Sequence, residues 1–144
     1  MLKLSTKGRY GSRLMLNLAR HHAEGEKSVI LRNISKEEEI SIRYLEQIII
    51  PLKINKLVTS TRGAGGGYAL ALHPSKIKLL DIIEILEGDI SLVDCVEDED
   101  CCERRKDCPT YPLWNEASKL LKTYFGSITL QGLLEMSKKK KTKK

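Results

Sequence analysis

Hydrophobic residues recur at helical intervals over much of the chain, which predicts a mainly α-helical protein. The first such stretch covers residues 6–24 and ends before Gly25, a common helix stop. Two shorter helices are predicted over 31–38 and 42–53, and Ser41 is the expected N-cap of the second. A short helix, a tight turn and a second helix form a helix-turn-helix unit, although a simple helical hairpin has the same pattern.

A β-hairpin is predicted directly after these helices. Residues 57–62 and 68–72 are short β-type runs on either side of the glycine cluster 63–67, and residues 28–30 form a further short β-type run. A helix-turn-helix followed by a hairpin is a winged helix. The glycine cluster does not resemble a nucleotide-binding loop, because it lacks the Lys-Ser/Thr pair and leads into a strand instead of a helix.

The second half of the chain is predicted to hold a short helix at 79–86, an irregular loop at 94–112, and then a long amphipathic helix. One apolar stripe on the long helix needs a partner, either the first helix or a second copy in a two-fold dimer. The stripe consists of Leu113, Ala117, Leu120, Leu121, Tyr124 and Ile128. A short helix at 129–137 and a disordered lysine tail at 138–144 are predicted to follow.

The predicted fold class is therefore mainly α with a small β-hairpin wing: a winged helix-turn-helix plus a long dimerisation helix. The expected divisions are a DNA-binding domain at 1–78, the loop and dimerisation helices at 79–137, and the tail. The formal net charge of +6 supports this division. Residues 1–78 hold 14 Lys/Arg against 6 Asp/Glu, whereas residues 79–137 hold 5 against 13. A basic first half suits a polyanion such as nucleic acid, unless the charges are segregated by chance.

Several function classes are excluded by the same sequence. The longest apolar run, residues 48–50, is far too short to cross a membrane, and the N-terminus lacks the hydrophobic region of a signal peptide. We therefore expect a cytoplasmic protein. No nucleophile and base, and no pair of catalytic carboxylates, can be placed in a common pocket, so an enzyme is not expected.

All four cysteines, Cys95, Cys101, Cys102 and Cys108, fall within the irregular loop. In a reducing compartment they are not expected to form a disulfide framework. Structural zinc usually requires a closely spaced cysteine pair of a kind that is missing here, so the spacing favours an iron–sulfur cluster over zinc. Free or redox-reactive thiols are the alternative. Seven acidic residues between 94 and 108 predict a low reduction potential for such a cluster.

The predicted second helix of the helix-turn-helix carries groups that suit base edges and phosphates near its N-terminal end, namely Ser41, Arg43, Tyr44, Glu46 and Gln47. An ordinary solvated helix face is the alternative interpretation. Arg62 lies at the base of the predicted wing, where it could enter the minor groove. Gly65 and the other wing glycines lack side chains, so the wing backbone can approach phosphates, and Lys7 and Arg9 on the first helix are expected to contact phosphate.

The sequence resembles the IscR-like superfamily of iron–sulfur regulators from residue 1 to about residue 136. The resemblance is carried by Leu4-Ser5-Thr6-Lys7-Gly8-Arg9-Tyr10, Tyr44-Leu45-Glu46-Gln47, Arg62-Gly63-Ala64-Gly65-Gly66-Gly67-Tyr68, the cysteine spacing, and Leu113-Trp114. It implies a homodimeric bacterial winged-helix transcription factor that binds a double-stranded DNA operator. Some branches of this superfamily bind clusters, and a cysteine-metabolism branch lacks the cysteines.

By position, the resemblance implies that Glu46 and Arg62 contact bases, with Arg43 and Ala64 nearby. It also implies that the helix starting near Pro112 forms the dimer interface. The implied cluster ligands are Cys95, Cys102 and Cys108, with Cys101 as an alternate or extra ligand. A 2Fe–2S cluster is favoured over a 4Fe–4S cluster.

One departure concerns Tyr111, because related regulators carry a histidine three residues after the last cysteine. The fourth ligand is therefore open between the spare cysteine, a loop carboxylate such as Asp107, a residue of the partner subunit, and solvent. The resemblance implies a repressor of iron–sulfur cluster assembly genes. The alternatives are a nitric-oxide or iron sensor, or a cysteine-metabolism repressor that acts with a cysteine-biosynthesis enzyme.

Overall fold

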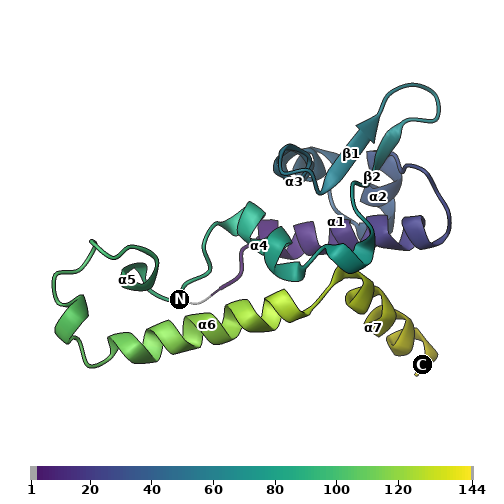
Figure 1. Ribbon diagram of the computed structural model, residues 1–144. Helices are drawn as coiled ribbons and strands as arrows, with labels where there is room; N and C mark the ends of the chain where they lie inside the picture. Colours follow the sequence, from purple (N-terminus) through teal and green to yellow (C-terminus); the bar gives the residue numbers. More distant parts are fainter. Residues whose placement is uncertain (1–2, 144) are drawn as a thin grey trace.

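The computed structural model describes residues 3–143 and confirms the predicted fold class (Figure 1). The helices are α1 (Thr6–Ala23), α2 (Leu31–Glu38), α3 (Ile42–Ile54), α4 (Leu79–Glu87), α5 (Asp94–Glu97), α6 (Tyr111–Ser127) and α7 (Leu130–Thr142). The strands are β1 (Val58–Thr61) and β2 (Gly67–Leu70), and 3-10 turns lie at Pro74–Lys76 and Arg105–Asp107. None of the helices in this part of the chain is long and apolar enough to cross a membrane.

The core is built around α1, because its apolar face is covered on several sides. Leu14 and Leu18 of α1 are buried together with Leu45 and Ile48 of α3 and Ile82 of α4. Each such side chain contributes about 1.5–3 kcal/mol through burial. The helix-turn-helix, formed by α2 and α3, is thereby fixed against α1, which runs beneath it in Figure 1.

The wing is an antiparallel hairpin that is also joined to the body of the domain. Its register runs from Val58 opposite Leu70 to Thr61 opposite Gly67. The predicted strand at 28–30 is reduced to a single bridge, in which Val29 and Tyr68 exchange two backbone hydrogen bonds of 2.8 Å.

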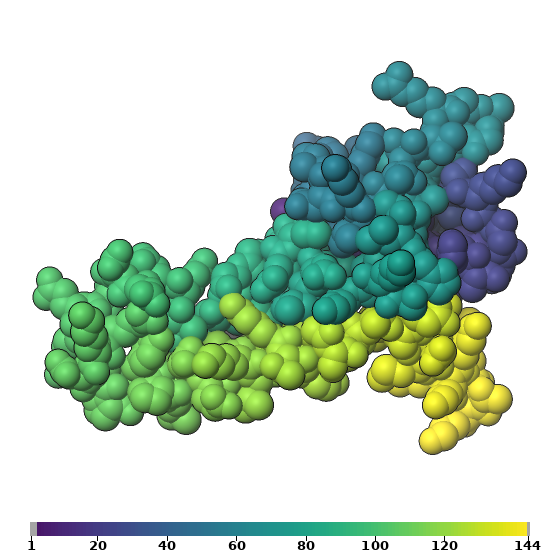
Figure 2. Space-filling model, viewed as in Figure 1, coloured from purple at the N-terminus to yellow at the C-terminus, as the bar shows by residue number. Residues whose placement is uncertain are grey.

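The second half of the molecule extends away from the wing. Helix α6 packs on α4 and carries the cysteine loop, residues 94–112, at its N-terminal end (Figure 1). The space-filling view shows this loop, in green, as a projection at one end of the molecule (Figure 2). Helix α7 leaves the body near α1, where its buried side chains Leu130 and Leu134 anchor it.

Two local predictions are wrong. The lysine tail was expected to be disordered, but α7 continues through it to Thr142; Lys144 lies outside the described residues. Thr129 caps this helix by accepting from the Gly132 amide at 3.0 Å, and lysine is a good helix former whose charge is favoured near a helix C-terminus. The loop at 94–112 also contains the short helix α5 and a 3-10 turn, both too short to give a periodic pattern.

Candidate DNA-binding surface and cysteine loop

Helix α3 has one buried and one exposed face. Ser41 caps its first turn, as predicted, because the Ser41 hydroxyl accepts from the Tyr44 amide at 3.2 Å. Leu45, Ile48, Ile49 and Leu52 are buried, whereas Arg43, Glu46 and Gln47 are exposed. The structure therefore presents three of the predicted contact residues on one free face near the helix N-terminus.

Tyr44 differs from its neighbours, because it is half-buried. Its ring packs edge-on against Tyr10 of α1 with 5.5 Å between the centroids, and the Arg13 guanidinium lies 5.4 Å from the Tyr10 ring. The Tyr44 side chain thus joins α3 to α1 in addition to bordering the exposed face.

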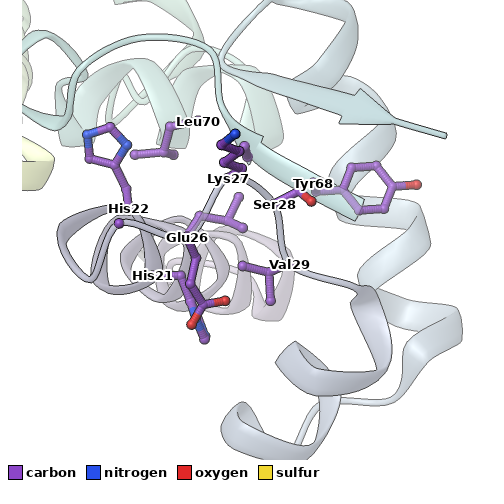
Figure 3. A pocket seen from close by; sticks show the side chains of 11 residues that line it. His21, His22, Glu26, Lys27, Ser28, Val29, Tyr68 and Leu70 are labelled. Atoms are coloured by element: carbon purple, nitrogen blue, oxygen red, sulfur yellow. The ribbon is translucent and has the colours of Figure 1, made fainter. Parts of the chain in front are cut away.

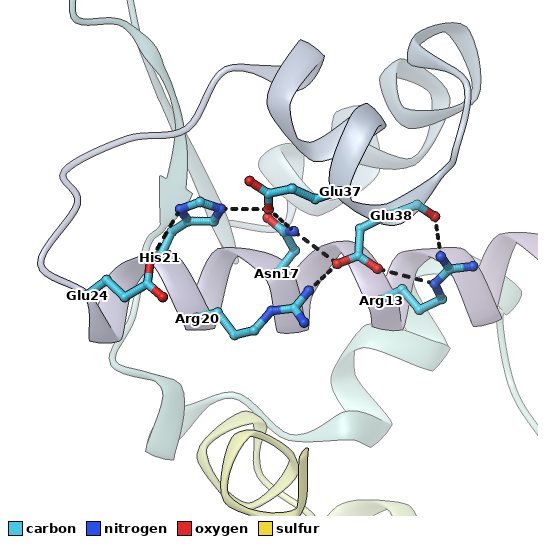
Figure 4. A network of polar contacts seen from close by, with 7 residues as sticks. All are labelled: Arg13, Asn17, Arg20, His21, Glu24, Glu37 and Glu38. Carbon is cyan, nitrogen blue, oxygen red and sulfur yellow. Dashed lines mark hydrogen bonds and ion pairs between the residues drawn. The ribbon is translucent and has the colours of Figure 1, made fainter. Parts of the chain in front are cut away.

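A buried carboxylate holds the helix-turn-helix on α1 (Figure 4). Glu38, at the end of α2, pairs with Arg13 at 3.3 Å and with Arg20, and it accepts from the Asn17 amide nitrogen at 3.0 Å. Its side chain is only 9% exposed, so these partners replace the water that it loses. Because α3 follows α2 after a tight turn, this network also determines where the exposed face of α3 points.

Arg62, Ala64 and Gly65 are exposed in the turn between β1 and β2, so Arg62 lies at the tip of the wing and not at its base as predicted. Ser28 donates a hydrogen bond of 2.8 Å to the Gly65 carbonyl in this turn. We call the set Arg43, Glu46, Gln47, Arg62, Ala64 and Gly65 the α3–wing surface. Helix α3 and the wing lie in the upper part of Figure 1, whereas α6 and α7 lie below. Lys7 is half-buried and Arg9 is exposed at the N-terminal end of α1.

A groove of about 430 Å³ separates the helix-turn-helix from the wing, and its lining includes Ile30, Lys53 and Arg62. Sequence reasoning did not select Lys53. The sequence spacing does indicate this position, because Lys53 falls seven positions after Glu46 and so lies on the same face of the helix. Ile50 and Ile54 are also strongly exposed there, at 57% and 72%.

The four cysteines differ in exposure. Cys95 on α5, Cys102 and Cys108 are half-buried, and Cys101 is exposed. Hydrogen bonds from the Thr110 hydroxyl and from the amides of Thr110 and Tyr111 lower the pKa of Cys108. Partial desolvation and the negative charge of Asp98 raise the pKa of Cys101. Metal ligation requires the thiolate, so Cys108 is the better prepared of these two.

Tyr111 is fixed beside this loop by Arg105. The Arg105 guanidinium lies 4.7 Å from the Tyr111 ring, donates to its hydroxyl at 2.6 Å, and pairs with Glu99 at 3.2 Å. Tyr111 therefore links the acidic part of the loop to the first turn of α6.

The structure does not gather the cysteine sulfurs into one ligand set. Within residues 3–143, no three of them lie within 4.8 Å of one another. Thiolates are ligands for both zinc and iron–sulfur clusters, so the side chains that could hold either are Cys95, Cys102 and Cys108, with Cys101 exposed beside them.

The predicted apolar stripe of α6 is divided between two directions. Leu113, Leu120 and Tyr124 are 59%, 62% and 60% exposed, and Ala117 lies between them. Leu121 faces the body, where it lines a cavity together with Leu4, Leu92 and Phe125. Ile128 ends the helix and is half-buried. The outer stripe is therefore Leu113, Ala117, Leu120 and Tyr124.

Together, a winged helix with an exposed helix face and wing, followed by a long helix with a free apolar stripe, defines a winged-helix transcriptional regulator. The chain matches the Rrf2 family model, described as an iron-dependent transcriptional regulator, over residues 4–136, and it belongs to that family. This confirms the predicted resemblance. Because its relatives are named transcriptional regulators, the expectation that the chain is not an enzyme is also confirmed.

The relatives include regulators of both branches. The HTH-type transcriptional regulator CymR of Bacillus subtilis is 42% identical over 132 residues, which cover 92% of this chain and 89% of CymR. The structure of CymR (YrzC), the global cysteine regulator of B. subtilis, matches with a TM-score of 0.78 and 41% identity over 94% of this chain and 98% of that chain. The structure of T. potens IscR matches with a TM-score of 0.74 and 38% identity over 94% and 88%.

Proposed function

We propose that the chain is a cytoplasmic, homodimeric repressor that binds a double-stranded DNA operator and senses iron–sulfur cluster status to control cluster assembly genes. The observation that carries the sensing role is the set of half-buried thiols Cys95, Cys102 and Cys108 at the base of α6. Cys101 is exposed and is the alternate or extra ligand. A 2Fe–2S cluster remains our preferred cofactor.

In this proposal the α3–wing surface contacts DNA. Arg43, Glu46 and Gln47 are free to enter the major groove, where arginine pairs with guanine and glutamate accepts from cytosine. Arg62 at the wing suits the minor groove. Ser41 and Tyr44 border the same face, and Lys7 and Arg9 are placed for phosphate contacts, which position a protein without reading the sequence.

The outer stripe of α6 is the proposed dimer interface, because three large apolar side chains are left more than half exposed along one helix. A cluster bound next to α6 would order the cysteine loop and bias the spacing of the two α3 helices across the dimer. Only a difference in cluster affinity between two DNA-binding states can produce such coupling.

The experiment is anaerobic purification followed by visible absorption and Mössbauer spectroscopy. We expect iron and sulfide in the wild type and in Cys101→Ser, and their loss in the variant with serine at Cys95, Cys102 and Cys108. Tyr111→His tests the fourth ligand, because a new imidazole ligand would change the iron spectrum. A colourless, iron-free wild type would contradict cluster sensing.

A second candidate is a repressor of cysteine metabolism that acts with a cysteine-biosynthesis enzyme. Two observations favour it: the 42% identity to CymR and the tyrosine at position 111. Specific capture of such an enzyme by an iron-free chain would support this candidate. A nitric-oxide or iron sensor is distinguished by loss of DNA binding on addition of nitric oxide or a chelator.

A further inference from the structure

A group of metal-ligating side chains lies outside the cysteine loop, where α1 ends and the chain turns toward α2. One ligand atom each from His21, Glu24 and Glu26 lies within 4.8 Å of the others. His21 Nδ1 is 2.9 Å from Glu26 Oε1 and 4.0 Å from Glu24 Oε2. Figure 3 shows His21 and Glu26 at the edge of a cavity of about 350 Å³, so the group is open to solvent on one side.

The second nitrogen of the same imidazole is held by another carboxylate. His21 Nε2 lies 2.9 Å from Glu37 Oε2, which also accepts from the Asn17 amide nitrogen at 2.7 Å (Figure 4). The His21 side chain is only 13% exposed. A carboxylate that accepts from one imidazole nitrogen and leaves the other for a metal is the usual arrangement around metal-bound histidine.

The hydrogen-bonding capacity of histidine indicates that a cation lies between His21 Nδ1 and the Glu26 carboxylate. A neutral imidazole has one N–H and one lone pair. If Nε2–H donates to Glu37, the lone pair of Nδ1 faces the Glu26 carboxylate at 2.9 Å. Two acceptors stay at that distance only with a cation between them, either a proton on the ring or a metal ion.

The surroundings favour a doubly charged cation. Three glutamates, Glu24, Glu26 and Glu37, surround one imidazole, and Arg20, whose charge also acts on Glu37, is paired with Glu38. The site also lies at the C-terminal end of α1, where the helix dipole is negative. Imidazole with carboxylates is a donor set that suits Zn²⁺ and related divalent transition metals.

We propose that His21 Nδ1, Glu24 and Glu26 bind a divalent transition-metal ion of the Zn²⁺ class, with Glu37 as the positioning residue. Glu37 belongs to α2, so an ion here ties the end of α1 and its following turn to the helix-turn-helix. The site shares no residue with the cysteine loop, and the two can be occupied independently.

The test is isothermal titration of the full reduced chain with Zn²⁺. Because cysteines also bind zinc, the comparison is between chains that differ only at this site. We expect the double variant Glu24→Gln, Glu26→Gln to bind one Zn²⁺ fewer per chain than the wild type. Glu135→Gln, which alters an exposed carboxylate on α7, should bind as the wild type does. Both glutamates of the site are exposed, so the fold should survive, which circular dichroism checks.

A full chain with all four cysteines changed to serine isolates the site. It should still bind one Zn²⁺, and Zn²⁺ should shift the ring nitrogen resonances of His21. Glu37→Gln should weaken this binding by about 10–100-fold, the usual effect of losing a partner of a metal-bound histidine. The proposal is overturned if the double variant binds as much Zn²⁺ as the wild type, or if the His21 resonances respond to pH but not to Zn²⁺.

Discussion

Among single residues, Glu38 makes the polar contacts that join α2 to α1. Its nearly buried carboxylate forms ion pairs with Arg13 and Arg20 and accepts a hydrogen bond from Asn17. We predict that Glu38→Gln lowers the free energy of unfolding by about 1–3 kcal/mol, since a neutral amide cannot satisfy both guanidinium groups. Urea unfolding measures this. Glu39→Gln alters the exposed neighbour and should change the free energy little; an equal loss in both variants would contradict the role of Glu38.

A second residue-level prediction concerns Gly67 at the start of β2. Its φ is +152°, and an added Cβ would lie 2.5 Å from the Val29 carbonyl oxygen. We predict that Gly67→Ala costs about 1–3 kcal/mol of stability and loosens the wing. Gly65→Ala is the matched control, because a Cβ there meets nothing within 4 Å. Similar unfolding midpoints for the two variants would show that the close approach to Val29 is unimportant.

At this scale the sequence predicts caps and exposed faces better than tertiary contacts. Ser41 was identified as an N-cap because that role depends only on the residues that follow it. The half-burial of Tyr44 depends on Tyr10, which lies on another helix, and no local pattern contains that information. The proposed ligands His21, Glu24 and Glu26 are close in sequence, but the carboxylate that orients His21 is Glu37 of α2, and no local pattern shows that contact.

Among the elements, α6 is joined to the linker that follows α4 by an ion pair between Lys122 and Asp89. Partial burial opposes ionisation of Asp89, but Lys122 and hydrogen bonds from Ser91 lower the pKa of Asp89 overall. A lowered pKa in the folded state means that the stabilisation is complete above the ordinary pKa of aspartate and is lost as pH falls through the folded pKa.

We therefore predict that Asp89→Asn lowers the free energy of unfolding by about 0.5–1 kcal/mol at neutral pH, as expected for a partly exposed pair. The difference from the wild type should shrink as pH falls below about 4. Denaturant unfolding across this pH range is the measurement. Glu116→Gln, an exposed carboxylate on α6, is the control and should show no such pH-dependent difference. A difference that is constant with pH would exclude the ion pair as its cause.

The helices and the hairpin were predictable because their apolar spacing and turn residues are local signals. Helix α2 begins and ends at the predicted residues. The pattern could not divide the α6 stripe into an outer side and a side facing the body, because both are apolar. The extension of α7 does not follow from the apolar pattern, because a run of lysines predicts solvated chain, although lysine itself favours helix.

For the whole molecule, we predict a dimer that forms through the exposed outer stripe of α6. Leu120 is 62% exposed, and we expect Leu120→Glu to shift the chain from dimer to monomer by placing a charge in an apolar interface. Sedimentation velocity measures the change. Ile54→Glu is the matched control, because Ile54 is an exposed apolar residue at the end of α3. A wild-type chain that sediments as a monomer would contradict the proposed interface.

For the molecule as a whole, we propose that a cluster on the cysteine loop controls which DNA the α3–wing surface binds. The most direct test is anaerobic selection from a random DNA pool with the wild type and with the variant lacking Cys95, Cys102 and Cys108. We predict that the wild type enriches a two-fold symmetric site with half-sites about one helical turn apart. The variant should bind this site more weakly or enrich a different one. Equal affinity of both proteins for the same sites, or no symmetric site, would contradict the claim.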